Sequence, residues 1–110
     1  MIGTVLLNVV ARVALRTRTP LEAKRVVDAI GRRLPPLSAQ KARRADERLA
    51  RWGTCLSRSM AIASRLPGAE VVIGVDLAPG SGLAAHAWVE RGGEVVSATH
   101  GTLREIARLR

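Results

Sequence analysis

Cysteine and aromatic residues are scarce in this chain. Its 110 residues include one cysteine, Cys55, and two tryptophans, but no tyrosine or phenylalanine. A single cysteine excludes an intramolecular disulfide and a cysteine-rich zinc site, and it indicates a reducing compartment. The shortage of stacking aromatics argues against single-strand nucleic-acid binding. We expect no metal, no cofactor, and a core of Ala, Val, Leu and Ile.

Acidic residues are also few. The chain has 9 Asp and Glu against 18 Lys and Arg, a formal net charge of +9. The basic residues are spread along the chain, as on solvated helix faces, without zinc-finger, leucine-zipper or helix-turn-helix spacing. We therefore expect no nucleic-acid partner; a basic nucleic-acid binder stays an alternative that strongly salt-dependent binding would reveal. The same positive field would speed encounter with an acidic peptide or protein.

Long apolar runs are absent. Residues 1–11 carry no charged side chain, but Arg12 ends a run that is shorter than the about 20 residues needed to cross a bilayer. The run also lacks the basic start of a signal peptide. We expect a soluble, cytoplasmic protein with no membrane partner. The length predicts a single domain over residues 1–110.

The first half of the sequence predicts four helices. Along residues 4–16, apolar residues recur on one broad helical face, namely Val5, Leu6, Val9, Val10 and Val13. A second helix begins after Thr19, with Pro20 at its first position and Glu22 completing a capping box, and it ends at Gly31. A third restarts near Ser38 after two prolines. Thr54 can cap a fourth, residues 55–66.

The second half predicts a small sheet. Alternating apolar residues indicate strands at residues 71–77, 84–90 and 94–98, with a glycine hairpin at residues 91–93. Thr102 and Glu105 form another capping box, which predicts a short final helix. The expected fold class is α+β, with a helical N-terminal half packed on a small antiparallel sheet.

Two residues could carry chemistry. Cys55 lies in the first turn of a predicted helix, where unpaired backbone N–H groups and the helix dipole stabilise a thiolate. His86 lies 31 residues downstream on a predicted strand, and a thiol nucleophile needs an imidazole to take its proton. A helix-borne cysteine facing a strand-borne histidine is the arrangement of papain-like and transglutaminase-like enzymes. The alternative is that both residues are structural, Cys55 as a small buried hydrophobe.

Three strings carry a resemblance to a known family. Residues 53–61 (GTCLSRSMA), 72–75 (VIGV) and 85–90 (AHAWVE), in this order, resemble the lasso-peptide leader peptidases, which are transglutaminase-like cysteine proteases. The resemblance covers residues 50–97. It implies that Cys55 is the nucleophile and His86 its general base in removing the leader from a precursor peptide. It also implies two separate partners, a leader-binding recognition protein and an ATP-dependent macrolactam cyclase.

The residue that orients His86 departs from the family pattern. Family spacing would put an Asp at Ala98, and hairpin registers pair His86 with Ser97, Ala98 or Thr99, none of which is a carboxylate. The orienting group is therefore open among Thr99, Ser97, a backbone carbonyl, Asp76 and Glu90; Asp76 would need the first strand beside the second. A chain that has lost catalysis and serves as a scaffold for precursor and cyclase is the alternative function.

Trp88 follows His86 by two residues and falls on the same strand face. It can shield the imidazole and line a substrate groove, or it can be a core aromatic. Trp52 is expected to pack at the end of its helix. The backbone N–H of Cys55 is the expected oxyanion donor.

Overall fold

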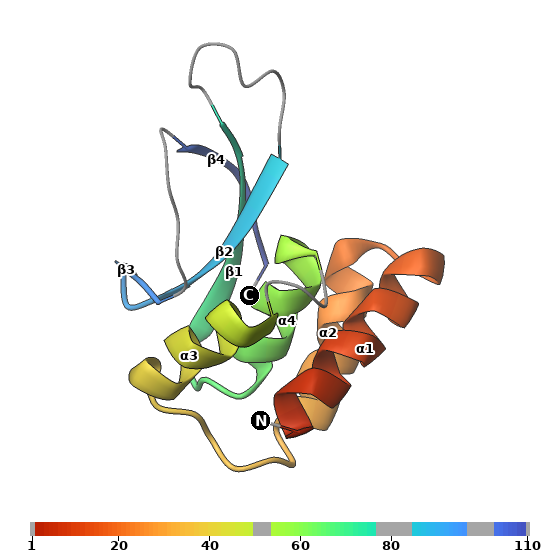
Figure 1. The fold of residues 1–110 in the computed structure, drawn as a ribbon. Coiled ribbons are helices and arrows are strands. Elements are labelled where there is room, and N and C mark those ends of the chain that lie inside the picture. Colours follow the sequence, from red (N-terminus) through yellow and green to blue (C-terminus); the bar gives the residue numbers. More distant parts are fainter. Residues whose placement is uncertain (1, 50–53, 77–84, 97–102, 110) are drawn as a thin grey trace.

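The computed structural model describes residues 2–49, 54–76, 85–96 and 103–109. In these ranges, helices fill the N-terminal half and antiparallel strands the rest (Figure 1). The elements in chain order are α1 (Ile2–Thr17), α2 (Pro20–Gly31), α3 (Ala39–Leu49), α4 (Cys55–Ser64), β1 (Ala69–Asp76), β2 (Ala85–Arg91), β3 (Glu94–Val95) and β4 (Leu103–Leu109). The α+β fold expected from the sequence is confirmed.

Local capping explains where α2 begins. Thr19 has an extended backbone, and its hydroxyl oxygen accepts a hydrogen bond from the N–H of Glu22 at 3.3 Å. The same hydroxyl donates to the Glu22 carboxylate at 3.0 Å, and Pro20 occupies the first helical position. The first N–H groups of a helix have no partner within it: Thr19 accepts a hydrogen bond from one of them, and proline has no N–H group. The predicted helix from Pro20 to Gly31 is confirmed at both ends.

The helix α1 packs through Leu7 and two alanines rather than through its most apolar face. Leu7, Ala11 and Ala14 are buried against the rest of the core, because alanine lets neighbouring backbones approach closely. The valines and the leucine that the sequence pattern placed on one broad face are exposed, except for half-buried Val10; they are Val5, Leu6, Val9 and Val13. The helix was predicted correctly, and this apolar face points outward.

The strands form one sheet in the order β3-β2-β1-β4. The hairpin between β2 and β3 turns at Gly92 and Gly93, whose φ angles of 60° and 83° lie in the region that glycine adopts most easily. This is the two-residue turn that the glycine pair favours. The described part of β3 is short, and residues 97–102 lie outside the described residues.

The segment expected to be a final helix is the strand β4, so that expectation is wrong. Residues 103–109 pair along β1, with Val71 opposite Leu109 and Asp76 opposite Leu103, and with a register shift between Ile73 and Gly74. A seven-residue segment with a local capping pattern is weakly specified, whereas pairing satisfies the hydrogen-bonding groups along one side of β1. The result puts β1 between two strands.

The helix α4 occupies the centre of the molecule. It contacts α1, α2, α3, β1 and β2. Met60 and Ile62 of α4 are fully buried, and so, almost completely, is Leu66 just after the helix. They share one core with Val71 and Val89 of the sheet. The helix α3 buries Ala42, Ala45 and Leu49 along one side, and its Arg43 donates to the backbone oxygen of Val96 at 3.1 Å. None of the described helices is long and apolar enough to cross a membrane.

Candidate active site

Cys55 opens the central helix, as expected. Thr54 caps α4: its backbone is extended, and its hydroxyl oxygen accepts a hydrogen bond from the N–H of Ser57 at 3.1 Å. Cys55 is a free, half-buried cysteine. Backbone N–H groups in the first turn of a helix have no acceptor within the helix, so they are available to an anion beside the thiol.

A buried polar pair fixes this end of α4 against α1. The hydroxyl of Ser57 donates to the side-chain oxygen of Asn8 at 2.8 Å, and both residues are almost completely buried. Thr54 donates to the Ser57 hydroxyl at 3.2 Å, which makes a chain of three polar groups. The sequence analysis missed this pair. An uncharged polar residue in the apolar run before Arg12 was the available signal, because buried polar groups are almost always hydrogen-bonded.

His86 lies near the start of β2 and pairs with Gly74 of β1. It is half-buried. Strand alternation puts His86, Trp88 and Glu90 on one face of the sheet and Ala87 and Val89 on the other.

The structure brings together the two elements that carry the predicted pair. Val89, on the strand face opposite to His86, joins the core beneath α4, and α4 contacts β2. The helix of Cys55 is therefore a neighbour of the strand of His86, but His86 belongs to the other face of that strand. Contact between the Cys55 sulfur and the His86 imidazole stays a prediction.

Trp88 covers the backbone opposite His86. A Cβ atom built on Gly74 would lie 2.6 Å from Cη2 and 2.8 Å from Cζ3 of the Trp88 indole. Since Gly74 is the strand partner of His86, the ring reaches along the sheet to the place beside the histidine. Trp88 is only 6% exposed, which fits the core interpretation of this residue. Its role in a substrate groove stays a prediction.

Comparison with known proteins supplies the family. The family model described as "Transglutaminase-like superfamily" matches residues 5–109, nearly the whole chain. The chain belongs to the transglutaminase-like superfamily. This superfamily includes cysteine peptidases and acyl transferases that act through a cysteine. No curated protein and no solved structure matches the chain significantly.

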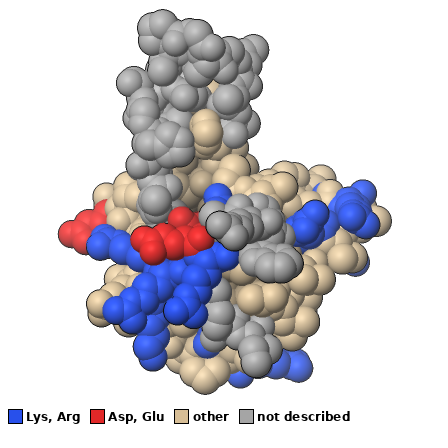
Figure 2. Space-filling view, viewed as in Figure 1, with Lys and Arg blue, Asp and Glu red and all other residues tan. Residues whose placement is uncertain are grey.

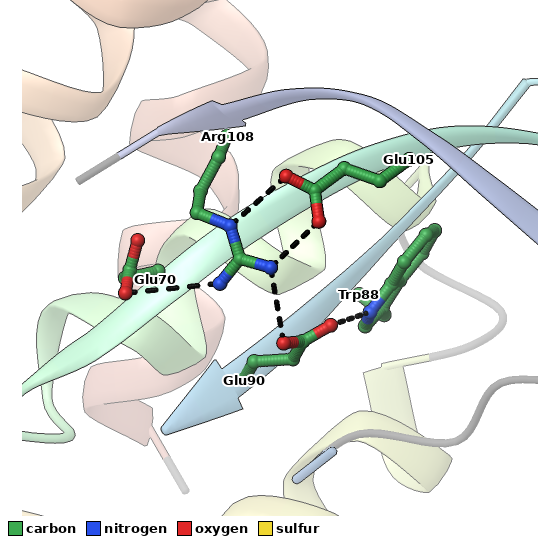
Figure 3. A network of polar contacts seen from close by, with 5 residues as sticks. All are labelled: Glu70, Trp88, Glu90, Glu105 and Arg108. Atoms are coloured by element: carbon green, nitrogen blue, oxygen red, sulfur yellow. Dashed lines mark hydrogen bonds and ion pairs between the residues drawn. The ribbon is translucent and has the colours of Figure 1, made fainter. Parts of the chain in front are cut away.

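On the outer face of this transglutaminase-like sheet, a polar network holds Trp88 (Figure 3). The indole Nε1 donates to Oε2 of Glu90 at 2.7 Å, and Oε1 of Glu90 accepts from Nη2 of Arg108 at 3.1 Å. Arg108 also donates to both carboxylate oxygens of Glu105, at 3.0 and 2.6 Å, and lies 3.7 Å from Glu70. The hydrogen bonds to Glu105, and then the one to Glu90, raise the pKa of Arg108 above its already high value, so it stays positively charged.

This network decides what Glu90 does. Its carboxylate binds Trp88 and Arg108, and four residues of extended strand, about 13 Å, separate it from His86. Glu90 therefore positions the indole and does not orient the imidazole. The sequence analysis missed Arg108 because it expected a short final helix opening at Thr102, and so gave no reason to place this residue beside Glu90.

The other proposed orienting residues are placed only in part. Thr99, Ser97 and Ala98 lie outside the described residues, as does Trp52. Asp76 ends β1, two residues after the strand partner of His86, and β1 lies beside β2. The topological condition for Asp76 is thus met, and its role stays a prediction.

A cavity of about 350 Å³ lies at the other end of α4. Its lining includes Ala63 to Ala69, together with the ion pair of Lys24 and Asp28, whose Nζ and Oδ2 atoms are 2.7 Å apart. Cys55 opens the same helix, ten residues long, so about 15 Å of helix separates the two ends. This cavity is distinct from the candidate active site.

Proposed function

We propose that this protein is a cysteine peptidase that removes the leader from a ribosomally made lasso-peptide precursor. Cys55 attacks the scissile carbonyl carbon, and His86 takes the thiol proton. The C–N bond breaks, the amine leaves with that proton, and the leader side remains as a thioester on Cys55. Water then hydrolyses the thioester, releasing a carboxylic acid and the free thiol.

The observation that carries the proposal is the position of Cys55 at the capped start of α4 in a transglutaminase-like chain. The helix terminus offers N–H groups to the developing oxyanion, and the expected donor is the backbone N–H of Cys55. The packing of α4 on β2, the strand of His86, supports the pairing. The strings around Cys55 and His86 support the choice of substrate class through the family resemblance.

Leader release tests the nucleophile. The cognate precursor, the leader-binding protein and either wild type or Cys55→Ala are mixed, and peptide masses are followed. We expect cleavage by wild type and none by Cys55→Ala, with matching circular dichroism spectra. Cleavage by Cys55→Ala at the wild-type rate would falsify the proposal.

Alkylation of the single cysteine tests the pair. We expect His86→Ala to slow the reaction of Cys55 with iodoacetamide near neutral pH at least about tenfold, because the imidazole no longer takes the thiol proton. The chain has one other histidine, so His100→Ala is a matched control that should react like wild type. Equal rates for wild type and both variants would mean that His86 does not activate Cys55.

A noncatalytic scaffold for precursor and cyclase is the second candidate. Two observations favour it: His86 belongs to the sheet face opposite to Val89, and the carboxylate of Glu90 on the same strand is bound to Trp88 and Arg108 instead of His86. A scaffold would bind precursor and cyclase equally well with Cys55→Ala, and wild type would leave the precursor mass unchanged. The mass measurement therefore separates the two functions.

A further inference from the structure

The helix α1 presents an apolar strip to solvent. Four aliphatic side chains at helical spacing are 39–58% exposed: Val5, Leu6, Val9 and Val13. They lie on the side of α1 opposite to the buried face of Leu7, Ala11 and Ala14. A helix that is apolar on both sides is normally covered on both sides. Only one side of α1 is covered by the described residues.

Arginines border this strip on one side. Arg12 and Arg16 are four residues apart, so they lie along one edge of the strip towards its C-terminal end. The helix contains no Asp or Glu. In Figure 2, the surface over α1 is mostly tan, with Lys and Arg at its upper right end and no Asp or Glu beside it. An occupant that matches this surface is aliphatic in the centre and carries carboxylates along one edge.

We propose that the outward face of α1 docks another protein, the leader-binding partner, through an aliphatic strip edged by carboxylates. The choice of this partner rests on the proposed function, whereas the docking face itself rests on the exposed strip and its arginine border. Docking buries Val5, Leu6, Val9 and Val13 and sets acidic side chains against Arg16 at the border of the strip. It leaves the start of α4 open to the precursor peptide.

Charge argues against a second copy of this chain on the strip. Each copy has a net charge of +9, and two α1 faces in contact would bring arginine borders together without a carboxylate on either helix. A lipid surface is also a poorer match. Interfacial helices carry Trp, Phe or Leu on the apolar face and abundant Lys or Arg on the other, whereas this face is mostly valine and its reverse side is buried in the protein core.

Binding of the purified leader-binding protein tests the proposal. Val9→Glu and Val13→Glu change exposed positions, so both variants should keep the wild-type circular dichroism spectrum. We expect the dissociation constant to rise at least about tenfold for each, because a charge is buried in an apolar contact. Ile106→Glu is the matched control, since Ile106 is at least as exposed as either valine but lies on β4. It should bind like wild type.

The arginine border has its own variant. Arg16→Glu should slow association several-fold at low salt, and the difference from wild type should shrink at about 0.5 M NaCl. Arg25→Glu, at an exposed position on α2, makes the same charge change away from the strip and should slow association less than Arg16→Glu does. Equal association rates for both variants would mean that charge on α1 does not guide docking.

Four outcomes would overturn the proposal. The first two are that wild type and both valine variants bind the leader-binding protein equally, and that wild type does not bind it. The third is a wild-type dimer in light scattering that Val13→Glu abolishes, which would assign the strip to a second copy. The fourth is that wild type alone floats with vesicles containing anionic lipid and Val13→Glu does not, which would assign the strip to a membrane surface. Cys55→Ala should bind the partner normally, so a failure of catalysis is distinguished from a failure of docking.

Discussion

Replacing Gly74 by alanine tests the placement of Trp88 beside His86. The added Cβ atom would lie 2.6 Å from Cη2 of Trp88 and 2.7 Å from the backbone oxygen of Arg104, where ordinary contacts are at least 3.4 Å. The indole is buried and held by Glu90, and the carbonyl belongs to the paired strand β4. Neither group can retreat without breaking a contact of its own.

The cost follows from two opposing effects. Overpacking a filled site costs about 1–3 kcal/mol, and replacing glycine by alanine within a strand returns about 0.5–1 kcal/mol. Because a ring and a backbone carbonyl both resist, we expect Gly74→Ala to lower the free energy of unfolding by about 2 kcal/mol. For a domain of this size, that corresponds to a melting temperature lower by roughly 8 °C. Urea unfolding should show a lower midpoint at an unchanged slope.

Gly3→Ala provides the matched control. The nearest atoms to its added Cβ are the ends of two side chains, Leu34 Cδ1 at 3.1 Å and Arg65 Nη1 at 3.3 Å, which need to move by only a few tenths of an ångström. Alanine is also favoured over glycine in a helix by up to about 1 kcal/mol. This variant should therefore be as stable as wild type or more so. If Gly74→Ala unfolded at the wild-type midpoint, the indole would not lie over Gly74, and the arrangement of Trp88 described above would be wrong.

Three further changes test the start of α4 and the outer sheet face. Thr54→Ala should lower stability by about 1 kcal/mol through loss of the helix cap, and Thr54→Asn should restore most of it; equal midpoints for all three proteins would exclude capping by Thr54. Ser57→Ala should cost about 1–3 kcal/mol in urea unfolding, because it removes the buried hydrogen bond to Asn8; a loss within measurement error would contradict that bond. Arg108→Gln should lower the melting temperature, and about 0.5 M NaCl should reduce the difference in melting temperature between this variant and wild type. Because folding raises the pKa of Arg108, its stabilising effect is complete at any pH below the pKa that Arg108 has in the unfolded chain. The difference in melting temperature between wild type and Arg108→Gln should therefore stay constant from about pH 7 to 10. A difference that disappears within this range would contradict the network.

Local chemistry explains what the sequence predicted well. The caps Thr19 and Thr54 accept hydrogen bonds from N–H groups three residues away, so nearby residues determine where α2 and α4 begin. Gly92 and Gly93 fix the hairpin in the same way. The position of Cys55 at a helix start followed from such local signals, and so did the position of His86 on a strand.

Long-range pairing explains what the sequence did not predict. The strand β4 depends on β1, some thirty residues earlier, and its own residues fit a capped helix equally well. The bond between Ser57 and Asn8 spans 49 residues, and that between Arg108 and Glu90 spans 18. The alternation of side chains along β2 defines two faces but does not say which one packs on α4. The core contacts of Val89 decide that. The sequence therefore placed the two candidate residues, Cys55 and His86, on the right elements but could not establish their contact.

The exposed strip on α1 raises the question of how much energy docking can draw from it. Full burial of a Val or Leu side chain contributes about 1.5–3 kcal/mol, and the four residues are roughly half exposed, so the strip offers about 3–6 kcal/mol. Association itself costs about 4 kcal/mol or more before any affinity remains. The strip alone is therefore too small to hold a partner. Stable docking requires the arginine border or contacts beyond α1 as well. For this reason, loss of charge at Arg16 should weaken a complex that the valines by themselves could not form.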